Sequence, residues 1–172
     1  PEPTVPTSPL MAFAGSWIEP GAGRALTISE EGMTIVNYTR ATCAYRNEHL
    51  TLSEAETMFT EPKAEGEQGF SFVVNGATEF DRLQFDRQPL PDACADIADQ
   101  DIDNPEFVFE HVWNNFNDYY PFFDLYDVDW QQQYQQFKPL VNAQTIQETL
   151  FEILSSMLAP LDDGHISLYT NS

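Results

Sequence analysis

The sequence predicts an α+β fold in which a small antiparallel β domain comes before a small helical bundle. Short β-rich runs separated by turn residues fill residues 11–87, whereas apolar residues recur at helical spacing from residue 105 onward. Between them, residues 88–104 form a connector rich in proline and aspartate, which is typical of a domain boundary. We therefore expect a β domain at 11–87 and, at 105–172, a domain of about three helices that ends in a strand.

The composition indicates a chain that folds around a core and does not bind nucleic acid. Aromatic residues make up 13% of the chain, which excludes a disordered activation domain, a class poor in such residues. Seven Lys and Arg stand against 28 Asp and Glu, for a net charge of −21, so the basic surface that nucleic acid requires is lacking. The same acidity disfavours anionic membranes, and no apolar stretch approaches the about 18 residues of a membrane-spanning helix.

The first ten residues, PEPTVPTSPL, carry four prolines and predict an extended linker. Such a linker often joins a targeting or anchoring sequence to a folded domain, and a frayed terminus fits the composition equally well. The chain starts at Pro1 without the pattern of a signal peptide, so we expect a processed or trimmed chain.

The β domain is predicted from runs of β-branched and aromatic residues. Ala25–Ser29 and Met33–Thr39 are the clearest runs, and the Glu-Glu-Gly sequence between them predicts a hairpin turn in which Gly32 takes a positive φ. Further short runs follow at His49–Ser53, Thr57–Thr60, Gly69–Val74 and Glu79–Phe85. The Asn75-Gly76 pair predicts a type I′ turn between the last two runs.

The topology of this domain is open between two alternatives. Closely spaced short strands are typical of an antiparallel meander or of a small barrel. Gly15-Ser16-Trp17 resembles the Gly-x-Trp sequence that opens lipocalin barrels. A lipocalin-like barrel would hold a ligand, whereas a filled barrel or a curved sheet would serve only as structure.

The two cysteines, Cys43 and Cys94, have 50 residues between them. This spacing does not suit a zinc site, which uses close pairs of ligands. The cysteines are either two buried thiols or one disulfide that ties the β domain to the connector. An oxidising compartment would favour the disulfide.

The helical domain begins with a well-marked helix. Asn104 is a suitable N-cap, Pro105 suits the first helical position, and Pro121 ends the helix. One apolar stripe with helical spacing runs along it: Phe109, Val112, Trp113, Phe116 and Tyr120. We expect the stripe to be buried, with Trp113 at its centre.

Two further helices are expected. Asp129 can cap a short helix at Trp130–Phe137. Thr145, with Glu148 three residues later, predicts a capping box at the start of the next helix. The apolar face of that helix holds Ile146, Leu150, Ile153, Leu154, Met157 and Leu158.

The chain is expected to end in a strand. Pro160 stops the third helix, and Asp162-Asp163-Gly164 predicts a turn after it. His165–Thr170 then follows the pattern of a strand, with Ile166 and Leu168 on one face.

The histidines supply the candidates for chemistry. His49 and His111 are interpreted as structural or surface residues. His165 opens a predicted strand, where rigid scaffolds commonly display catalytic side chains, and Asp162 or Asp163 can orient or charge its imidazole. The alternative is a turn with an incidental histidine. A metal site at these three residues would lack further local ligands, so we expect no metal.

No complete active site is predicted from the residues alone. The sequence contains no nucleophile elbow, P-loop, dinucleotide fingerprint or His-Glu-x-x-His motif. No motif around Cys43 indicates nucleophilic catalysis. We therefore also expect no cofactor.

Four short stretches of the helical domain carry a family resemblance: VWNNF at 112–116, YYPFF at 119–123, VDW at 128–130 and LDDGHISL at 161–168. In this order they resemble the N-terminal helical region of the tail-specific, or C-terminal processing, serine peptidases. The nearer branch is the tricorn-like one, which is similar to the repeats of interphotoreceptor retinoid-binding protein. The resemblance covers about residues 105–172 and does not extend to the β domain.

The resemblance implies a larger α/β core that supplies the nucleophilic Ser and most of the oxyanion hole. In the tricorn-like branch a His at the end of the helical region is the general base, and His165 matches it by position. In the C-terminal processing branch a core Lys takes that role. Because the sequence ends at Ser172 before any such core, we expect the N-terminal part of a peptidase, inactive alone.

The family also implies the setting of the protein. The parent would be a periplasmic, secreted or envelope-attached bacterial peptidase, and its peptide or protein substrate would bind through the core. The alternative is a non-enzymatic module that binds a ligand or peptide in a lipocalin-like β domain.

Overall fold

The computed structural model describes residues 8–46 and 49–169. The chain divides into two compact units on either side of the Ala98–Asp99 bond, a point inside the connector at residues 88–104. Each unit has its own hydrophobic core. Residues 1–7 of the predicted linker lie outside the described residues.

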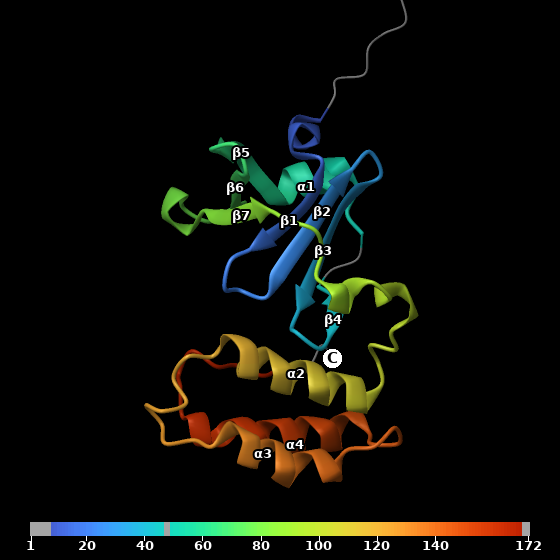
Figure 1. Ribbon diagram of the computed structural model, residues 1–172, viewed down its shortest axis with the longest axis vertical. Helices are drawn as coiled ribbons and strands as arrows, with labels where there is room; N and C mark the ends of the chain where they lie inside the picture. Colours follow the sequence, from blue (N-terminus) through green and yellow to red (C-terminus); the bar gives the residue numbers. More distant parts are fainter. Residues whose placement is uncertain (1–7, 47–48, 170–172) are drawn as a thin grey trace, which may run out of the picture. The chain divides into compact units, whose positions relative to one another are not determined.

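The first unit is an open antiparallel sheet of seven strands in the order β4-β3-β2-β1-β7-β6-β5 (Figure 1). The strands are β1 (Gly15–Glu19), β2 (Arg24–Ser29), β3 (Gly32–Tyr38), β4 (Cys43–Tyr45), β5 (Phe59–Glu65), β6 (Gly69–Val74) and β7 (Leu83–Arg87). Because β1 pairs with both β2 and β7, it joins two local meanders. Within the described residues the edge strands β4 and β5 do not pair with each other, so the antiparallel meander is confirmed and the closed lipocalin-like barrel is wrong.

Alternation along the strands produces two buried faces. In β2, Leu26 and Ile28 face the main core, and Ala25 faces a smaller cluster on the opposite side. The main core is rich in aromatic rings and holds Leu10, Trp17, Leu26, Ile28, Met33, Ile35, Ala55, Phe59, Phe70, Phe72 and Phe85. Leu10 reaches this core from a 3-10 helix at Pro9–Phe13. The expectation that residues 9 and 10 belong to a linker is therefore wrong.

A disulfide between Cys43 and Cys94 lies in the smaller cluster. Cys43 opens β4, and Cys94 ends a 3-10 helix at Asp92–Cys94. Both side chains are buried. The bond fastens the start of the connector to an edge of the sheet.

Several predicted strands have different structures. The run His49–Ser53 is not a strand, because Leu50 makes only a single bridge to Met33 and α1 (Leu52–Met58) begins two residues later. A capping box at Thr51 and Glu54 starts α1. The run Thr57–Thr60 spans the end of α1 and the start of β5, and Glu79–Phe85 begins with a 3-10 helix at Glu79–Asp81.

The two predicted turns differ in outcome. Gly32 has a φ of +141°, and a Cβ there would lie 2.0 Å from the carbonyl oxygen of Leu50, so only glycine fits. At Asn75-Gly76 only Gly76 has a positive φ, and the Ala77 N–H donates to the Val74 carbonyl. A type I′ turn needs positive φ at both positions, so that prediction is wrong.

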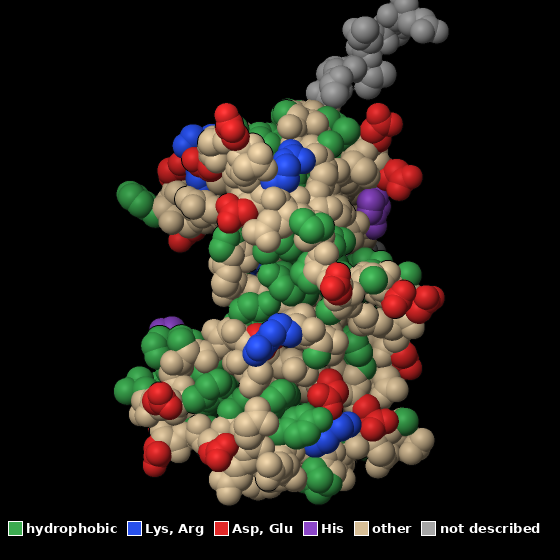
Figure 2. Space-filling model, in the orientation of Figure 1, with side chains coloured by type: hydrophobic (Ala, Val, Ile, Leu, Met, Phe, Trp, Pro, Cys, Tyr) green, Lys and Arg blue, Asp and Glu red, His purple; other side chains and the backbone are tan. Residues whose placement is uncertain are grey.

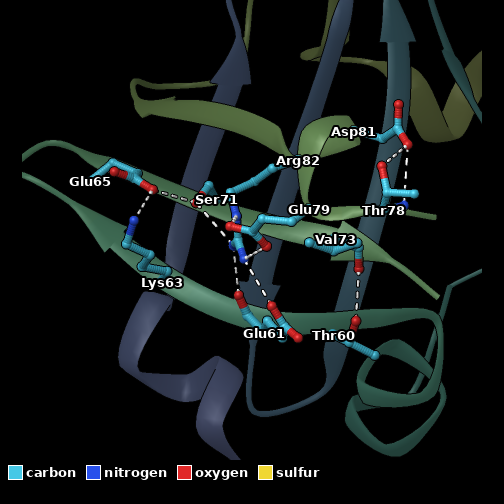
Figure 3. A network of polar contacts seen from close by, with 10 residues as sticks. All are labelled: Thr60, Glu61, Lys63, Glu65, Ser71, Val73, Thr78, Glu79, Asp81 and Arg82. Atoms are coloured by element: carbon cyan, nitrogen blue, oxygen red, sulfur yellow. Dashed lines mark hydrogen bonds and ion pairs between the residues drawn. The ribbon is translucent and has the colours of Figure 1, made fainter. Parts of the chain in front are cut away.

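A polar network centred on Arg82 holds an irregular part of β5 (Figure 3). The pairing of β5 with β6 shifts register between Thr60 and Lys63, where Glu61 has a φ of +53°. The Arg82 guanidinium donates to the Glu61 carbonyl at 2.8 Å and pairs with Glu79 at 2.6 Å. Since every contact joins elements of the sheet unit, we interpret the network as structural.

The second unit contains α2 (Pro105–Tyr119), α3 (Trp130–Phe137) and α4 (Gln147–Leu158). Asn104 and Asp129 cap α2 and α3 as predicted. The capping box at Thr145 is wrong: Ile146 is the N-cap of α4, and the Thr145 hydroxyl accepts from the Asn142 N–H instead. No helix of the described residues is long and apolar enough to cross a membrane.

The chain after α4 is not a strand where it is described. A 3-10 helix at Ala159–Leu161 leads into residues 162–169, which have no strand assignment. Ile166 and Leu168 pack against the helical core. The described residues of this unit contain no strand with which they could pair. Thr170 of the predicted strand lies outside the described residues.

Two tryptophans join α2 to α3. The Trp113 Nε1–H donates to the Trp130 carbonyl at 3.2 Å, and the Trp130 Nε1–H donates to the Trp113 carbonyl at 3.1 Å. Their rings are nearly parallel, with an interplanar angle of 3°. Both side chains are buried, so each polar atom needs the partner that the other residue supplies.

The substitution Trp113→Ala should lower the free energy of unfolding by about 3–5 kcal/mol, as truncation of a large buried aromatic does. Urea denaturation followed by the helical circular dichroism signal measures this loss. The control Phe122→Ala, at a side chain that is 50% exposed, should change stability by less than about 1 kcal/mol. A similarly small loss for Trp113→Ala would mean that the stripe is not a core.

Replacing both cysteines, Cys43→Ala with Cys94→Ala, should lower the stability of the sheet unit by about 2–4 kcal/mol, because the unfolded chain loses a cross-link. Urea denaturation of the double variant and of the oxidised parent chain gives the difference. Thiol alkylation of the native oxidised chain should label neither cysteine. Two labelled cysteines would contradict the disulfide.

Candidate functional site

The candidate site is built on a tight turn that follows α4. Leu161 is fully buried and fixes the start of the turn, whereas Ile166 packs on the same core at its end. Between these anchors Asp162 has a φ of +43°, in the left-handed region. The Ile166 N–H donates to the Asp163 carbonyl at 3.0 Å. The turn therefore holds residues 163–165 at a defined place on the surface.

The side chain of His165 is exposed, but hydrogen bonds to Asp163 hold it in place. Its side chain is 97% exposed, while that of Asp163 is 8% exposed. Both the backbone nitrogen and Nδ1 of His165 lie 2.9 Å from Asp163 Oδ1. When Nδ1 carries the proton it donates to this carboxylate, and Nε2 keeps its lone pair. Nε2 has no hydrogen bond with any described residue, so it is available to accept a proton.

The second oxygen of Asp163 is also occupied. The Tyr120 hydroxyl donates to Asp163 Oδ2 at 2.9 Å. The backbone N–H of His165, then its imidazole, then the Tyr120 hydroxyl lower the pKa of Asp163. Burial, followed by the bond to Asp163, raises the pKa of Tyr120 to about 12. At neutral pH the side chain of Asp163 is therefore a carboxylate and that of Tyr120 a neutral phenol.

A hollow of about 360 Å³ lies beside the turn. It is lined by Ser155, Leu158, Asp163, Gly164, Ile166 and Leu168, among others. One wall comes from α4, with Ser155 and Leu158, and the other wall is the turn itself. The hollow is large enough for one side chain of another molecule or segment.

The sequence-predicted site residues are only partly brought together. Asp163 contacts His165, but Asp162 makes no hydrogen bond or ion pair with it in the described part of the chain. Among residues 8–46 and 49–169, no group of three or more His, Cys, Asp or Glu side chains could hold a metal. Cys43 and Cys94 are joined in the other unit.

The other two histidines have structural surroundings. His49 uses both ring nitrogens, with Nδ1 lying 3.0 Å from the Thr34 hydroxyl and Nε2 lying 2.9 Å from the Glu31 carbonyl. His111 stacks on Phe107, and burial lowers the pKa of its imidazole. Neither has the combination of an exposed nitrogen and an orienting carboxylate that His165 has.

The site can move a proton but has no nucleophile of its own. No serine hydroxyl within the described ranges hydrogen-bonds to His165, and neither cysteine is free. Sequence reasoning missed Tyr120, which it assigned only to the apolar stripe. Its hydroxyl reaches a carboxylate 43 residues away, and no local pattern signals such a contact.

Acid should loosen the turn through Asp163. Because the folded state lowers the pKa of Asp163, the hydrogen bonds stabilise the turn above the unfolded-state pKa, and this contribution is lost as pH falls through the folded-state pKa. Titration of the carboxyl carbon by NMR should show Asp163 ionising at lower pH than an ordinary aspartate. Asp163→Asn should abolish the acid transition of the turn. An Asp163 that ionises at or above the ordinary value would contradict the geometry.

The helical unit matches a known family. Residues 103–159 match the model of the tricorn protease C1 domain, a range that includes α2, α3 and α4 and ends before the Asp163 turn. No curated protein matches the chain, and no solved structure matches it. The chain therefore contains a tricorn protease C1 domain and is related to the tricorn-like peptidases at the level of that domain.

Proposed function

We propose that this chain is the non-catalytic N-terminal region of a serine peptidase of the tail-specific, tricorn-like family. We further propose that His165 is the general base for a nucleophilic Ser that these residues do not supply. The observation that carries the proposal is the C1 domain at residues 103–159. Six residues after it, the exposed imidazole of His165 is hydrogen-bonded to the carboxylate of Asp163.

The geometry suits a base that is completed by another segment. Asp163 accepts a hydrogen bond from the Nδ1–H of His165, so Nε2 can remove the proton of a serine hydroxyl as the oxygen attacks the scissile carbonyl. The imidazolium then gives this proton to the leaving amine, and water hydrolyses the acyl-enzyme by the same route. Asp163 stabilises the imidazolium throughout. Base catalysis of this kind contributes about 10²–10⁴-fold.

The exposure of His165 favours its role as the base over the packing role that the C-terminal processing branch implies. In that branch a core Lys is the base, and the residues equivalent to His165 only pack. A side chain that is 97% exposed contributes little packing to this unit. A Ser-Lys pair remains the competing assignment, and the substitution below separates the two.

The proposed compartment follows from the disulfide. Disulfides persist in oxidising compartments and are rare in reducing ones, and the Cys43–Cys94 bond is typical of the former. We therefore propose a periplasmic, secreted or envelope-attached bacterial protein. The peptide or protein substrate would bind through the core of the parent, and the sheet unit would position substrate or domains.

A second candidate is a non-enzymatic module that binds a ligand or peptide in the sheet unit. It is favoured by a hollow of about 200 Å³ whose lining includes Phe72, Phe85, Arg24 and Arg46. That volume is below the about 300–1,000 Å³ of most small-molecule sites. The candidate therefore ranks behind the peptidase.

The test is His165→Ala in the full-length parent. It should lower kcat by about 10²–10⁴-fold and leave KM nearly unchanged, because a base acts on the chemical step. His49→Ala, at an exposed histidine of the other unit, is the matched control and should have no such effect. Hydrolysis of casein and of peptides with apolar C-termini measures both.

Two results would count against the proposal. Full activity of the His165→Ala parent would exclude the base role and favour the Ser-Lys branch. Turnover by the 172-residue chain alone, scaling with protein and surviving an inhibitor-trap control, would contradict a non-catalytic region that lacks the acylating Ser and the oxyanion donors.

A further inference from the structure

Tyr120 links the end of a helix to the candidate base. It is the C-cap residue of α2, and its N–H donates to the Phe116 carbonyl at 2.9 Å. Its hydroxyl donates to Asp163 Oδ2 at 2.9 Å. One residue therefore ties the rigid end of α2 to the turn that carries His165.

The ring of Tyr120 is itself fixed by aromatic contacts. Its centroid lies 5.0 Å from that of Phe123 and 5.6 Å from that of Phe116. Phe123 stacks on Trp130 at 5.2 Å, and Trp130 makes the reciprocal hydrogen bonds with Trp113. The phenol is thus held by the core and is not a mobile surface group.

The bond from Tyr120 restricts the carboxylate of Asp163. Asp163 accepts three hydrogen bonds. Its Oδ1 accepts from the backbone N–H and from Nδ1–H of His165, and its Oδ2 accepts from the Tyr120 hydroxyl. With Oδ2 engaged, rotation of the carboxylate would break the phenol contact. Oδ1 therefore stays directed at Nδ1 of His165.

We propose that Tyr120 is a positioning residue that orients Asp163 so that the proton of His165 stays on Nδ1 and Nε2 remains the acceptor. The tautomer of an imidazole is set by the hydrogen bond that its other nitrogen makes, and supporting groups of this kind hold reactive side chains in their working geometry. The consequence for catalysis rests on the proposed function of His165. The consequence for the tautomer is independent of that proposed function and can be measured in this chain.

The test variant is Tyr120→Phe, which keeps the ring and removes the hydroxyl. The control is Tyr134→Phe, because the Tyr134 hydroxyl likewise donates to a carboxylate, Glu110, at 2.7 Å in the same unit. Nitrogen-15 NMR of the neutral imidazole reports which ring nitrogen of His165 carries the proton. Thermal unfolding of both variants reports any general loss of structure.

Tyr120→Phe should lower the ratio of the Nδ1–H to the Nε2–H tautomer by about three- to tenfold, the range expected for one hydrogen bond. Tyr134→Phe should leave the ratio unchanged. In the full-length parent, Tyr120→Phe should lower kcat by a similar factor with KM unchanged. An unchanged tautomer ratio in Tyr120→Phe, with or without a loss of stability, would overturn the proposal.

Failure of the two proposals can be told apart. A shifted tautomer in Tyr120→Phe, together with a fully active His165→Ala parent, would support the positioning role and reject His165 as the base. An unshifted tautomer together with an inactive His165→Ala parent would reject the positioning role and support the base.

Discussion

The helical unit depends on the reciprocal hydrogen bonds between Trp113 and Trp130. Each indole satisfies a backbone carbonyl of the neighbouring helix, so the two helices cannot slide without leaving buried polar atoms unpaired. Phe123 packs on Trp130 and Tyr120 packs on Phe123. The position of His165 is therefore set by contacts that begin in the core and end at Asp163. Acidic side chains are spread over both units in Figure 2, and Asp163 is the one that this chain of contacts uses.

The sheet unit is stabilised by different means. Its inner face is filled by aromatic rings, its connector is fastened by the disulfide, and the irregular part of β5 is held by Arg82. None of these features presents an exposed reactive group. This agrees with the proposal that the chemistry involves His165 of the helical unit.

Local signals predicted the helices of the second unit and the central hairpin of the sheet, and long-range contacts could not be predicted from them. The caps of α2 and α3, the aromatic stripe and the β2–β3 hairpin follow from neighbouring residues. The helix α1 was missed because its two ends overlap the runs at His49–Ser53 and Thr57–Thr60, which were read as strands, and the capping box at Thr51 and Glu54 was overlooked. The prediction of a closed barrel was wrong because closure depends on pairing between the edge strands β4 and β5, which lie far apart in the sheet and which local sequence does not specify. His165 was found from its turn, but Tyr120 was not, because sequence spacing says nothing about a contact across 43 residues.

The most direct test of His165 as the base is a crystal structure of the proposed full-length parent with a peptidyl phosphonate that labels its nucleophilic serine. We predict His165 Nε2 within hydrogen-bond distance of that serine oxygen, about 2.6–3.2 Å, with Nδ1 still bonded to Asp163. A lysine nitrogen at that position, with His165 far from the labelled serine, would contradict His165 as the base.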